Sequence, residues 1–254
     1  DIDTNTGAGN ILFSSTVATG DNNLSLDAGA SGNITADKSI TGGGVFTVVD
    51  GAVQKYSGVV TVDSLDIQDA TTSVTLDGAL TSAGAVNIDS GGTIALNAAA
   101  SGTTFDIDAS GVTTIAAAGD ITASGAVTFG ANKSGTLTTS GDIDTSNDNV
   151  TFTRAVTLGG AVDIDTNTGA GNILFSSTVA TGDNNLSLDA GASGNITADK
   201  SITGGGAFTV RDGAVQKYSG VVTVDSLDIK DATTSVTLDG DVTTKTTLDI
   251  NSGG

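Results

Sequence analysis

Alternating acidic residues are the groups in this chain with the clearest capacity for chemistry. The run Asp1-Ile2-Asp3-Thr4-Asn5 carries oxygen-bearing side chains at every second position, and it recurs as Asp163-Ile164-Asp165-Thr166-Asn167. Such oxygens suit Ca²⁺, although the glycine stands at the seventh place of the run and no glutamate follows at the twelfth. The weak calcium candidates are therefore Asp1, Asp3, Asn5, Asp163, Asp165 and Asn167. The alternatives are diffuse cation binding and a strand in which Asp-Ile-Asp simply points outward, inward and outward.

The chain has few of the side chains from which active sites are usually built. The chain has no His and no Cys, and its only arginines are Arg154 and Arg211. Its aspartates are spread along the whole length, whereas glycoside hydrolysis needs two carboxyl groups close together. Nucleophilic triads and thiolate metal sites are excluded, and Gly42-Gly43-Gly44 lacks the Gly-Lys-Ser/Thr that completes a phosphate-binding loop. We predict no enzyme, no catalytic residues and no cofactor, with calcium as the one ion left open.

Threonine pairs raise a different chemistry. Thr-x-Thr occurs at Thr4/Thr6, Thr136/Thr138 and Thr151/Thr153, and regular threonine ladders on a flat face would suggest ice binding. These pairs are not separated by a constant number of residues. We therefore interpret the high threonine content as the β-propensity of an exposed strand face.

The composition favours an all-β protein. All 29 acidic residues are aspartates, only nine residues are basic, and the net charge is −20. Such a charge disfavours nucleic acids and anionic membranes as partners, while it keeps long assemblies soluble. No apolar run approaches the ~18 residues of a membrane span. The chain is 37% hydrophobic and its apolar residues alternate regularly, which favours packed strands over disorder. The absence of Pro agrees, because Pro removes a hydrogen-bond donor from interior strands.

A long internal repeat organises the chain. Residues 163–254 repeat residues 1–92, and only three of the first 78 aligned positions differ. Such a copy is compatible with a stacked architecture, in which each unit contacts only its neighbours. We expect one continuous segment over residues 1–254, with a long unit at 1–162 and a partial second copy at 163–254. Because the chain opens and closes in mid-repeat, we expect it to be a fragment of a longer protein.

A shorter period lies inside the long one. Apolar-polar-apolar triplets begin at spacings of 22, 19, 21, 19 and 22 residues, and each is followed by turn-forming residues. The triplets are Leu24–Leu26, Phe46–Val48, Leu65–Ile67, Val86–Ile88, Phe105–Ile107 and Val127–Phe129. This pattern predicts an all-β parallel β-solenoid of about 20 residues per coil and about 12–13 coils, because strands this short need neighbours above and below. The register between Phe129 and Val162 stays open.

Alternation predicts which side chains form the core. The two apolar residues of each triplet should point inward, and Ser25, Thr47, Asp66 and Asn87 should point outward. The differences between the copies follow the same parity, since Val45/Ala207, Val49/Arg211 and Gln68/Lys230 all fall at outward positions. The phenylalanines are expected to fill the core and to stack between coils.

Three phrases carry a resemblance to a known family. Gly119–Phe129, Gly160–Asp165 and Gly194–Ala198 resemble the repeats of filamentous-haemagglutinin-type exoproteins and of giant bacterial surface proteins. The resemblance covers the whole chain through a degenerate pattern, and the family's N-terminal secretion domain is not visible. It implies a right-handed β-helix outside the bacterial cell.

The expected function is therefore structural. We expect the shaft of an extracellular filament or surface adhesin, extended by end-to-end stacking of coils. Its partners would be further repeats of the same protein or other copies of it, and cell-surface glycans. The alternatives are a β-helix module that binds carbohydrate or a host surface, and a polysaccharide lyase or hydrolase.

Overall fold

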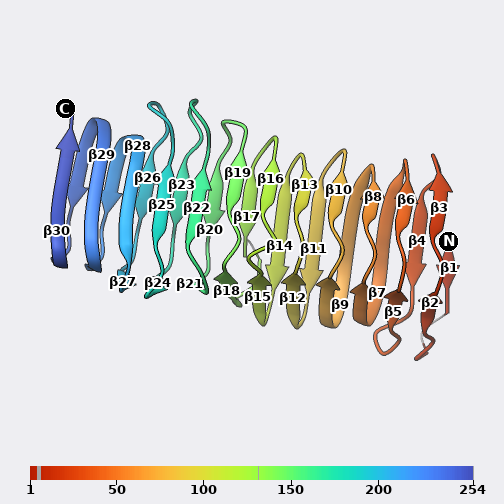
Figure 1. Cartoon of the computed structure of the whole chain (residues 1–254). Coiled ribbons are helices and arrows are strands. Elements are labelled where there is room, and N and C mark those ends of the chain that lie inside the picture. The colour runs from red at the N-terminus through yellow and green to blue at the C-terminus, as the bar shows by residue number, and fades with distance from the viewer. Residues whose placement is uncertain (5–6, 131, 254) are drawn as a thin grey trace. The chain divides into compact units, whose positions relative to one another are not determined.

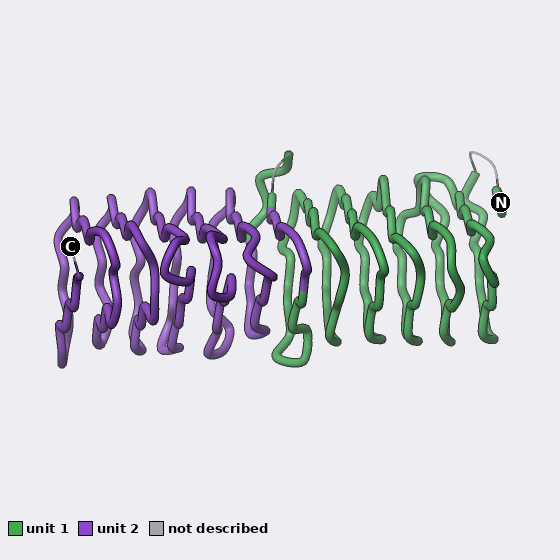
Figure 2. Tube along the Cα trace, turned by 90° about the horizontal axis from the view of Figure 1, so that it is seen from above, with its two compact units in different colours: residues 1–122, 130–136 green, residues 123–129, 137–254 purple. Residues whose placement is uncertain are grey.

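The chain folds as an all-β parallel solenoid. The computed structural model describes residues 1–4, 7–130 and 132–253. It contains about 12 coils, and equivalent positions in consecutive coils lie about 21 residues apart. Contacts divide the chain into two compact units, residues 1–122 with 130–136 and residues 123–129 with 137–254 (Figure 2). No helix long and apolar enough to cross a membrane is found in the described residues.

Short strands make up each coil (Figure 1). The strands of the first unit are β1 (Ile2–Asp3), β2 (Ile11–Phe13), β3 (Val17–Gly20), β4 (Leu24–Asp27), β5 (Ile34–Ala36), β6 (Ile40–Gly42), β7 (Val45–Tyr56), β8 (Val60–Val62), β9 (Ser64–Leu76), β10 (Leu80–Ser82), β11 (Val86–Ser90), β12 (Thr93–Leu96), β13 (Ala100–Gly102), β14 (Phe105–Ala109), β15 (Val112–Ile115) and β16 (Ile121–Ala123). The last residue of β16 belongs to the second unit.

The second unit has the same organisation. Its strands are β17 (Val127–Phe129), β18 (Thr136–Thr139), β19 (Ile143–Thr145), β20 (Val150–Phe152), β21 (Val156–Leu158), β22 (Val162–Asp165), β23 (Ile173–Phe175), β24 (Val179–Gly182), β25 (Leu186–Asp189), β26 (Ile196–Ala198), β27 (Ile202–Gly204), β28 (Ala207–Tyr218), β29 (Val222–Leu238) and β30 (Val242–Ser252). The first residue of β18, Thr136, belongs to the first unit.

Parallel pairing joins each coil to the next. Within the first unit, β11 pairs with β9 through Val86↔Leu65 and with β14 through Val86↔Phe105. Within the second unit, β20 pairs with β17 through Val150↔Val127 and with β23 through Val150↔Ile173. Backbone hydrogen bonds therefore run along each unit from coil to coil, which satisfies the peptide groups that such short strands could not satisfy alone.

The predicted inward residues form the core. Leu26, Phe46, Val48 and Ile67 are buried, as are Leu65, Val86 and Ile88. Leu24 is only half-buried, whereas its copy Leu186 is buried because Val162 pairs with it from the preceding coil. The alternation rule therefore identifies the inward side, and the neighbouring coil decides how completely a residue is buried.

Aromatic rings reinforce the core. Phe129, Phe152 and Phe175 stack face to face across three coils, with ring centroids 5.3 and 4.7 Å apart. Phe46 meets Tyr56 edge to face at 5.7 Å. The Tyr56 hydroxyl donates to Gln54 Oε1 at 3.1 Å, and Gln54 Nε2 donates to the carbonyl of Asp69, so this buried polar pair is hydrogen-bonded. The prediction that phenylalanines stack between coils is confirmed for Phe129, Phe152 and Phe175.

The register that the sequence left open is now clear. β17, β20 and β23 stack in line, with Val127, Val150 and Ile173 in register at intervals of 23 residues. Between β17 and β18, Asn132 donates from its backbone and side-chain nitrogens to Asp108 Oδ2, and Lys133 forms an ion pair with Asp89. The 23-residue interval is longer than the 19–22 residues between the earlier triplets, which explains why the sequence pattern became hard to follow here.

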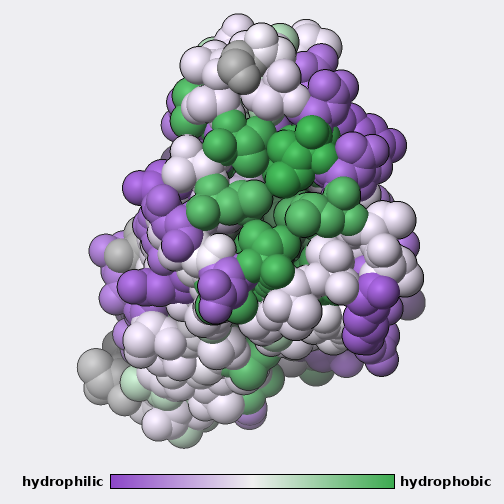
Figure 3. All heavy atoms as spheres, turned by 90° about the vertical axis from the view of Figure 1, so that its left-hand side faces the viewer, coloured by the Kyte–Doolittle hydropathy of each residue, from purple (hydrophilic) through white to green (hydrophobic). Residues whose placement is uncertain are grey.

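Apolar side chains are exposed at the C-terminal end of the second unit (Figure 3). Leu248 and Ile250 of β30 are 53% and 39% exposed, whereas the aligned residues of the first copy, Val86 and Ile88, are buried. In the first copy, β14 pairs with the strand that carries Val86 and Ile88. The same pattern of residues is therefore covered or open according to whether another coil packs against it.

Candidate functional site

The acidic pair Asp163 and Asp165 lies on the outside of β22. Ile164, between them, is buried, as the alternation predicted. Arg211 of β28 reaches both carboxylates, with Nη2 2.9 Å from Asp163 Oδ1 and 3.3 Å from Asp165 Oδ2. Its Nε lies 3.2 Å from Asp189 Oδ2 on the intervening strand β25. The guanidinium on β28 thus bridges three carboxylates that lie on the two preceding coils.

The internal repeat shows what this arginine replaces. In the first copy the aligned residue is Val49, which is 39% exposed. The aligned carboxylates there are Asp1, Asp3 and Asp27, and no arginine occurs in residues 1–92. The sequence correctly predicted that Val49 and Arg211 point outward. It did not show that Arg211 faces the calcium candidates Asp165 and Asp163, because these lie 46 and 48 residues before it in the chain.

The remaining calcium candidates have mixed placements. Asn167 adopts a left-handed backbone with φ of 67°, and its N–H donates to Asp165 Oδ1 at 2.6 Å, which makes it a turn residue. Asp1 and Asp3 are exposed, and Asn5 lies outside the described residues. Across the part of the chain that the structure describes, no group of three or more acidic side chains could hold a metal ion. Calcium binding stays a prediction.

Exchanging the residues of the two copies tests the arginine bridge. We expect Arg211→Val to lower the free energy of unfolding by about 1 kcal/mol at low salt, because the pairs are partly exposed and solvent screens them. Val49→Arg should raise stability by a similar amount. Urea denaturation at low and high salt measures both effects, and high salt should shrink them. A stabilising Arg211→Val would contradict this assignment.

Carboxylates also stack at one corner of each copy. Asp27 pairs in register with Asp50, and Asp69 is the next acidic neighbour of Asp50. Burial raises the pKa of Asp50 above its ordinary value of 3.8, and the charges of Asp69 and Asp27 raise it further, against the opposing hydrogen bond from the Gly51 amide. Burial likewise raises the pKa of Asp212, with added repulsion from Asp231 and Asp189.

These raised pKa values predict an unusual response to acid. A carboxyl group with a higher pKa in the folded state binds its proton more tightly there, so folding gains stability as the pH falls toward 3.8 and loses it as the pH rises. Burial raises the pKa of Asp163 in the same direction, although Arg211 opposes it. We therefore expect the melting temperature to rise as the pH falls from 7 toward 3.8.

The control variant removes both titrations. Asp50→Asn with Asp212→Asn should be more stable than the parent chain at pH 7 and should flatten the slope. Asp77 has the opposite effect on the pH dependence, because the side-chain hydrogen bond from Asn97 lowers its pKa below 3.8. The stability that this carboxylate contributes should therefore be lost as the pH falls below 3.8. Thermal melts followed by circular dichroism at several pH values provide the measurement. A melting temperature that falls steadily from pH 7 downward in the parent chain would refute the prediction.

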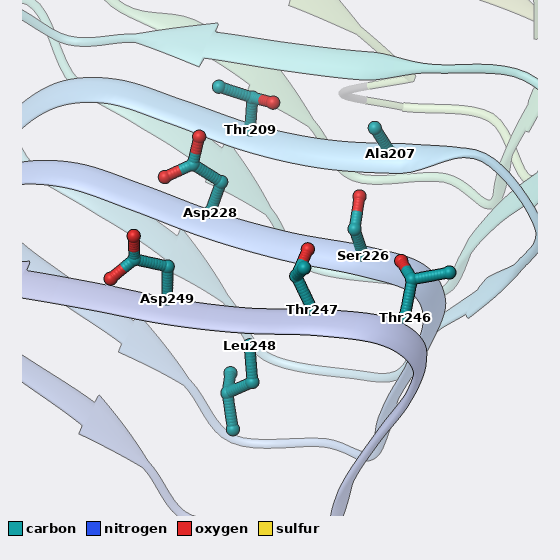
Figure 4. A pocket seen from close by; sticks show the side chains of 8 residues that line it. All are labelled: Ala207, Thr209, Ser226, Asp228, Thr246, Thr247, Leu248 and Asp249. Atoms are coloured by element: carbon teal, nitrogen blue, oxygen red, sulfur yellow. The ribbon is translucent and has the colours of Figure 1, made fainter.

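A shallow depression of about 640 Å³ lies on the side of β28, β29 and β30 (Figure 4). Thr209, Asp228 and Asp249 follow one another in register along one column of it. The neighbouring column consists of Ala207, Ser226 and Thr247. Hydroxyl and carboxylate oxygens can accept and donate hydrogen bonds here, but the lining residues include neither a basic side chain nor an aromatic ring.

The glycine run that resembled part of a phosphate loop is a corner between coils. Gly44 has φ of 107°, and a Cβ placed on it would lie 2.7 Å from the backbone carbonyl of Asn22. Only glycine allows the two coils to approach so closely with this backbone. The run Gly42–Gly44 is therefore explained by packing.

Sequence reasoning missed a regular column of hydroxyl groups. Thr41, Thr61 and Thr81 occupy the middle of β6, β8 and β10 and pair in register. Each lies 20 residues after the one before, so a constant spacing was present in the sequence. The Thr-x-Thr pattern does not reveal it, because each of these strands carries a single threonine at that position.

No protein-family model, curated protein or solved structure matches the chain. The filamentous-haemagglutinin resemblance therefore rests on the sequence pattern alone.

Proposed function

We propose that this chain is a segment of a structural shaft in an extracellular bacterial filament or surface adhesin. The observation that supports a structural role most strongly is the unbroken parallel pairing of coils within each unit, around a core that is buried along its length. Pulling on such a stack is resisted by many hydrogen bonds and apolar contacts in succession. This arrangement suits a structural element better than a catalyst, so we propose that the chain is not an enzyme.

The proposed shaft grows by addition of coils. Further repeats of the same protein, or another copy of it, would stack on the open strand edges. The apolar side chains of β30 and the unpaired backbone groups of an edge strand support this part of the proposal. A net charge of −20 would keep the assembly soluble and gather cations diffusely around it.

A second role has one supporting observation. The depression over Thr209, Asp228 and Asp249 offers hydrogen-bonding groups of the kind that contact sugar hydroxyls. A glycan array probed with this chain tests carbohydrate binding. Asp228→Ala should abolish any signal, and Asp66→Ala, which removes the aligned aspartate of the first copy, is the matched control.

Electron microscopy of native material tests the proposed shaft. Antibodies raised against this chain should label continuous fibres at the surface of the source cells, with an axial repeat of ~4.8 Å, the spacing between paired strands. Labelling of compact particles inside the cells would rule the proposal out.

A further inference from the structure

The first strands of the chain form an edge whose covered state is visible in the second unit. Residues 1–28 and 163–190 have the same sequence. In the second unit, β22, β23 and β24 pair with β19, β20 and β21 of the preceding coil. Among the described residues of the first unit, the equivalent strands β1, β2 and β3 pair only with β4, β5 and β6 of the following coil. We call residues 10–27 the N-terminal edge.

The covering coil buries this edge where it is present. Phe175 and Val179 are each 1% exposed in the second unit. The identical residues of the first copy, Phe13 and Val17, are half-buried, and Leu12 between them is 63% exposed. The N-terminal edge therefore exposes apolar surface that the same sequence buries against a preceding coil.

A side-chain hydrogen bond changes in the same way. Asn184 Nδ2 donates to the carbonyl of Leu158 in the covering coil at 3.0 Å. Asn22, the aligned residue of the first copy, donates to the carbonyl of Thr19 in its own coil, also at 3.0 Å. A partner for the N-terminal edge must therefore bring both apolar side chains and strand carbonyls.

The C-terminal coil has the pattern of the covering coil. Residues 150–165 and 236–251 align without a gap, and six of the sixteen residues are identical. Apolar strands begin every six residues in both, at Val150, Val156 and Val162 in the covering coil. In the C-terminal coil they begin at Val236, Val242 and Leu248. We call residues 236–251 the C-terminal edge.

The C-terminal edge is as open as the N-terminal one (Figure 3). Leu248 is 53% exposed and Val236 is half-buried, whereas the aligned residues of the first copy, Val86 and Val74, are 1% and 0% exposed. An edge strand also leaves backbone N–H and C=O groups without partners. Both ends therefore present complementary surfaces of the kind that coils bury between them.

We propose that the C-terminal edge of one copy stacks on the N-terminal edge of a second copy, head to tail. This inference rests on the proposed stacking of coils and specifies its partner and register. The end of β29 pairs with β2, and β30 pairs with β3 and β4, as β20, β21 and β22 pair with β23, β24 and β25. Residues 248–251 take the place over β4 that β1 holds in the single chain through two exposed residues.

The covering coil also specifies the contacts of this interface. Leu248 covers Leu24 of the second copy, as Val162 covers Leu186. Val156 N–H donates to the Thr178 carbonyl in the second unit, and the equivalent bond between copies runs from Val242 N–H to the Thr16 carbonyl. Because the two edges differ, each copy in a pair keeps one edge open, and the contact repeats as an open filament.

Sedimentation velocity of the purified 254-residue chain over a range of concentrations tests the association. The parent chain should form oligomers whose size grows with concentration. Leu248→Lys places a charge in the covered position over Leu24 and should weaken association at least about tenfold. Val49→Lys is the matched control, because it adds the same charge to an exposed apolar residue on the side of β7, where the second copy carries Arg211. This control should associate like the parent chain.

Single cysteines determine the register of the contact. Thr157 pairs with Ala180 in the second unit, so a Thr243→Cys copy mixed with an Ala18→Cys copy should form a disulfide-linked pair after mild oxidation. A Thr243→Cys copy mixed with a Leu12→Cys copy tests the neighbouring strand of the N-terminal edge, and it should stay unlinked.

Three results would overturn the inference: a parent chain that stays monomeric, equal association of the two lysine variants, or stronger linking to Leu12→Cys than to Ala18→Cys. The proposed shaft fails on a different result, the absence of labelled fibres from the native material. The two proposals are therefore tested separately.

Discussion

Replacing Phe152 with alanine should lower the free energy of unfolding by about 3–5 kcal/mol. Phe152 is fully buried, and its ring lies between those of Phe129 and Phe175 in the coils on either side. Alanine at this position would remove both ring contacts and leave a cavity, which neighbouring strands held by ladder hydrogen bonds on both sides cannot easily fill. Denaturant unfolding followed by circular dichroism measures the loss.

Hydrogen exchange locates the effect of this substitution. Amides of β17, β20 and β23 should exchange faster in Phe152→Ala, while those of β4, β7 and β9 should change little, because a solenoid transmits contacts only between neighbours. Thr151→Ala removes the adjacent outward side chain and should cost far less. Similar losses for the two variants would show that Phe152 does not belong to a packed core.

Replacing Asp66 with proline should cost about 3 kcal/mol or more. Asp66 points outward from β9, between Thr47 on β7 and Asn87 on β11. Proline removes a backbone donor in a strand that is paired on both sides, and it leaves the opposite carbonyl without its partner. The chain contains no proline at all, as such strands require. Thermal unfolding of the variant provides the measurement.

The control separates the backbone from the side chain. Asp66 accepts hydrogen bonds from Asn87 Nδ2 at 2.9 Å and from Gln68 Nε2 at 2.8 Å, and Asp66→Ala removes both. These exposed contacts are worth little, so alanine should cost well under half as much as proline. If proline and alanine have equal effects, β9 is not paired on both sides.

The sequence was sufficient to predict the architecture because each coil repeats the same pattern of apolar triplets and turn residues. Apolar triplets separated by turn residues specify short strands, and residues such as Ile67 and Ile88 cannot be buried unless coils stack in parallel. The inward parity was right for every triplet residue, and only Leu24 was less buried than its neighbours, for want of a strand beyond it. Periodicity alone therefore gives the class, the coil length and the core.

Contacts between distant coils could not be derived in the same way. Arg211 meets Asp163 and Asp165 only because two coils of slightly different length bring them to one edge, so a small error in coil length would separate them. The longer interval of 23 residues between Val127, Val150 and Ile173 hid the register for a similar reason. The threonine column was accessible in principle, since Thr41, Thr61 and Thr81 are equally spaced, but its meaning depends on knowing which strand face is outward.

The register of neighbouring coils underlies the proposed shaft, the acidic corner and the column of Thr41, Thr61 and Thr81. The chain has no cysteine, so engineered pairs report it without interference. Thr61→Cys with Thr81→Cys joins positions that pair across adjacent coils, and ~4.8 Å between strands is within the range that a disulfide spans. Thr61→Cys with Ser101→Cys places the thiols two coils apart, at about 10 Å, which is too far.

Mass spectrometry after mild oxidation decides the question. We expect an intramolecular disulfide in nearly all molecules of the Thr61→Cys/Thr81→Cys variant and free thiols in the Thr61→Cys/Ser101→Cys variant. Free thiols in the first variant, or equal crosslinking in both, would contradict the parallel stack of coils.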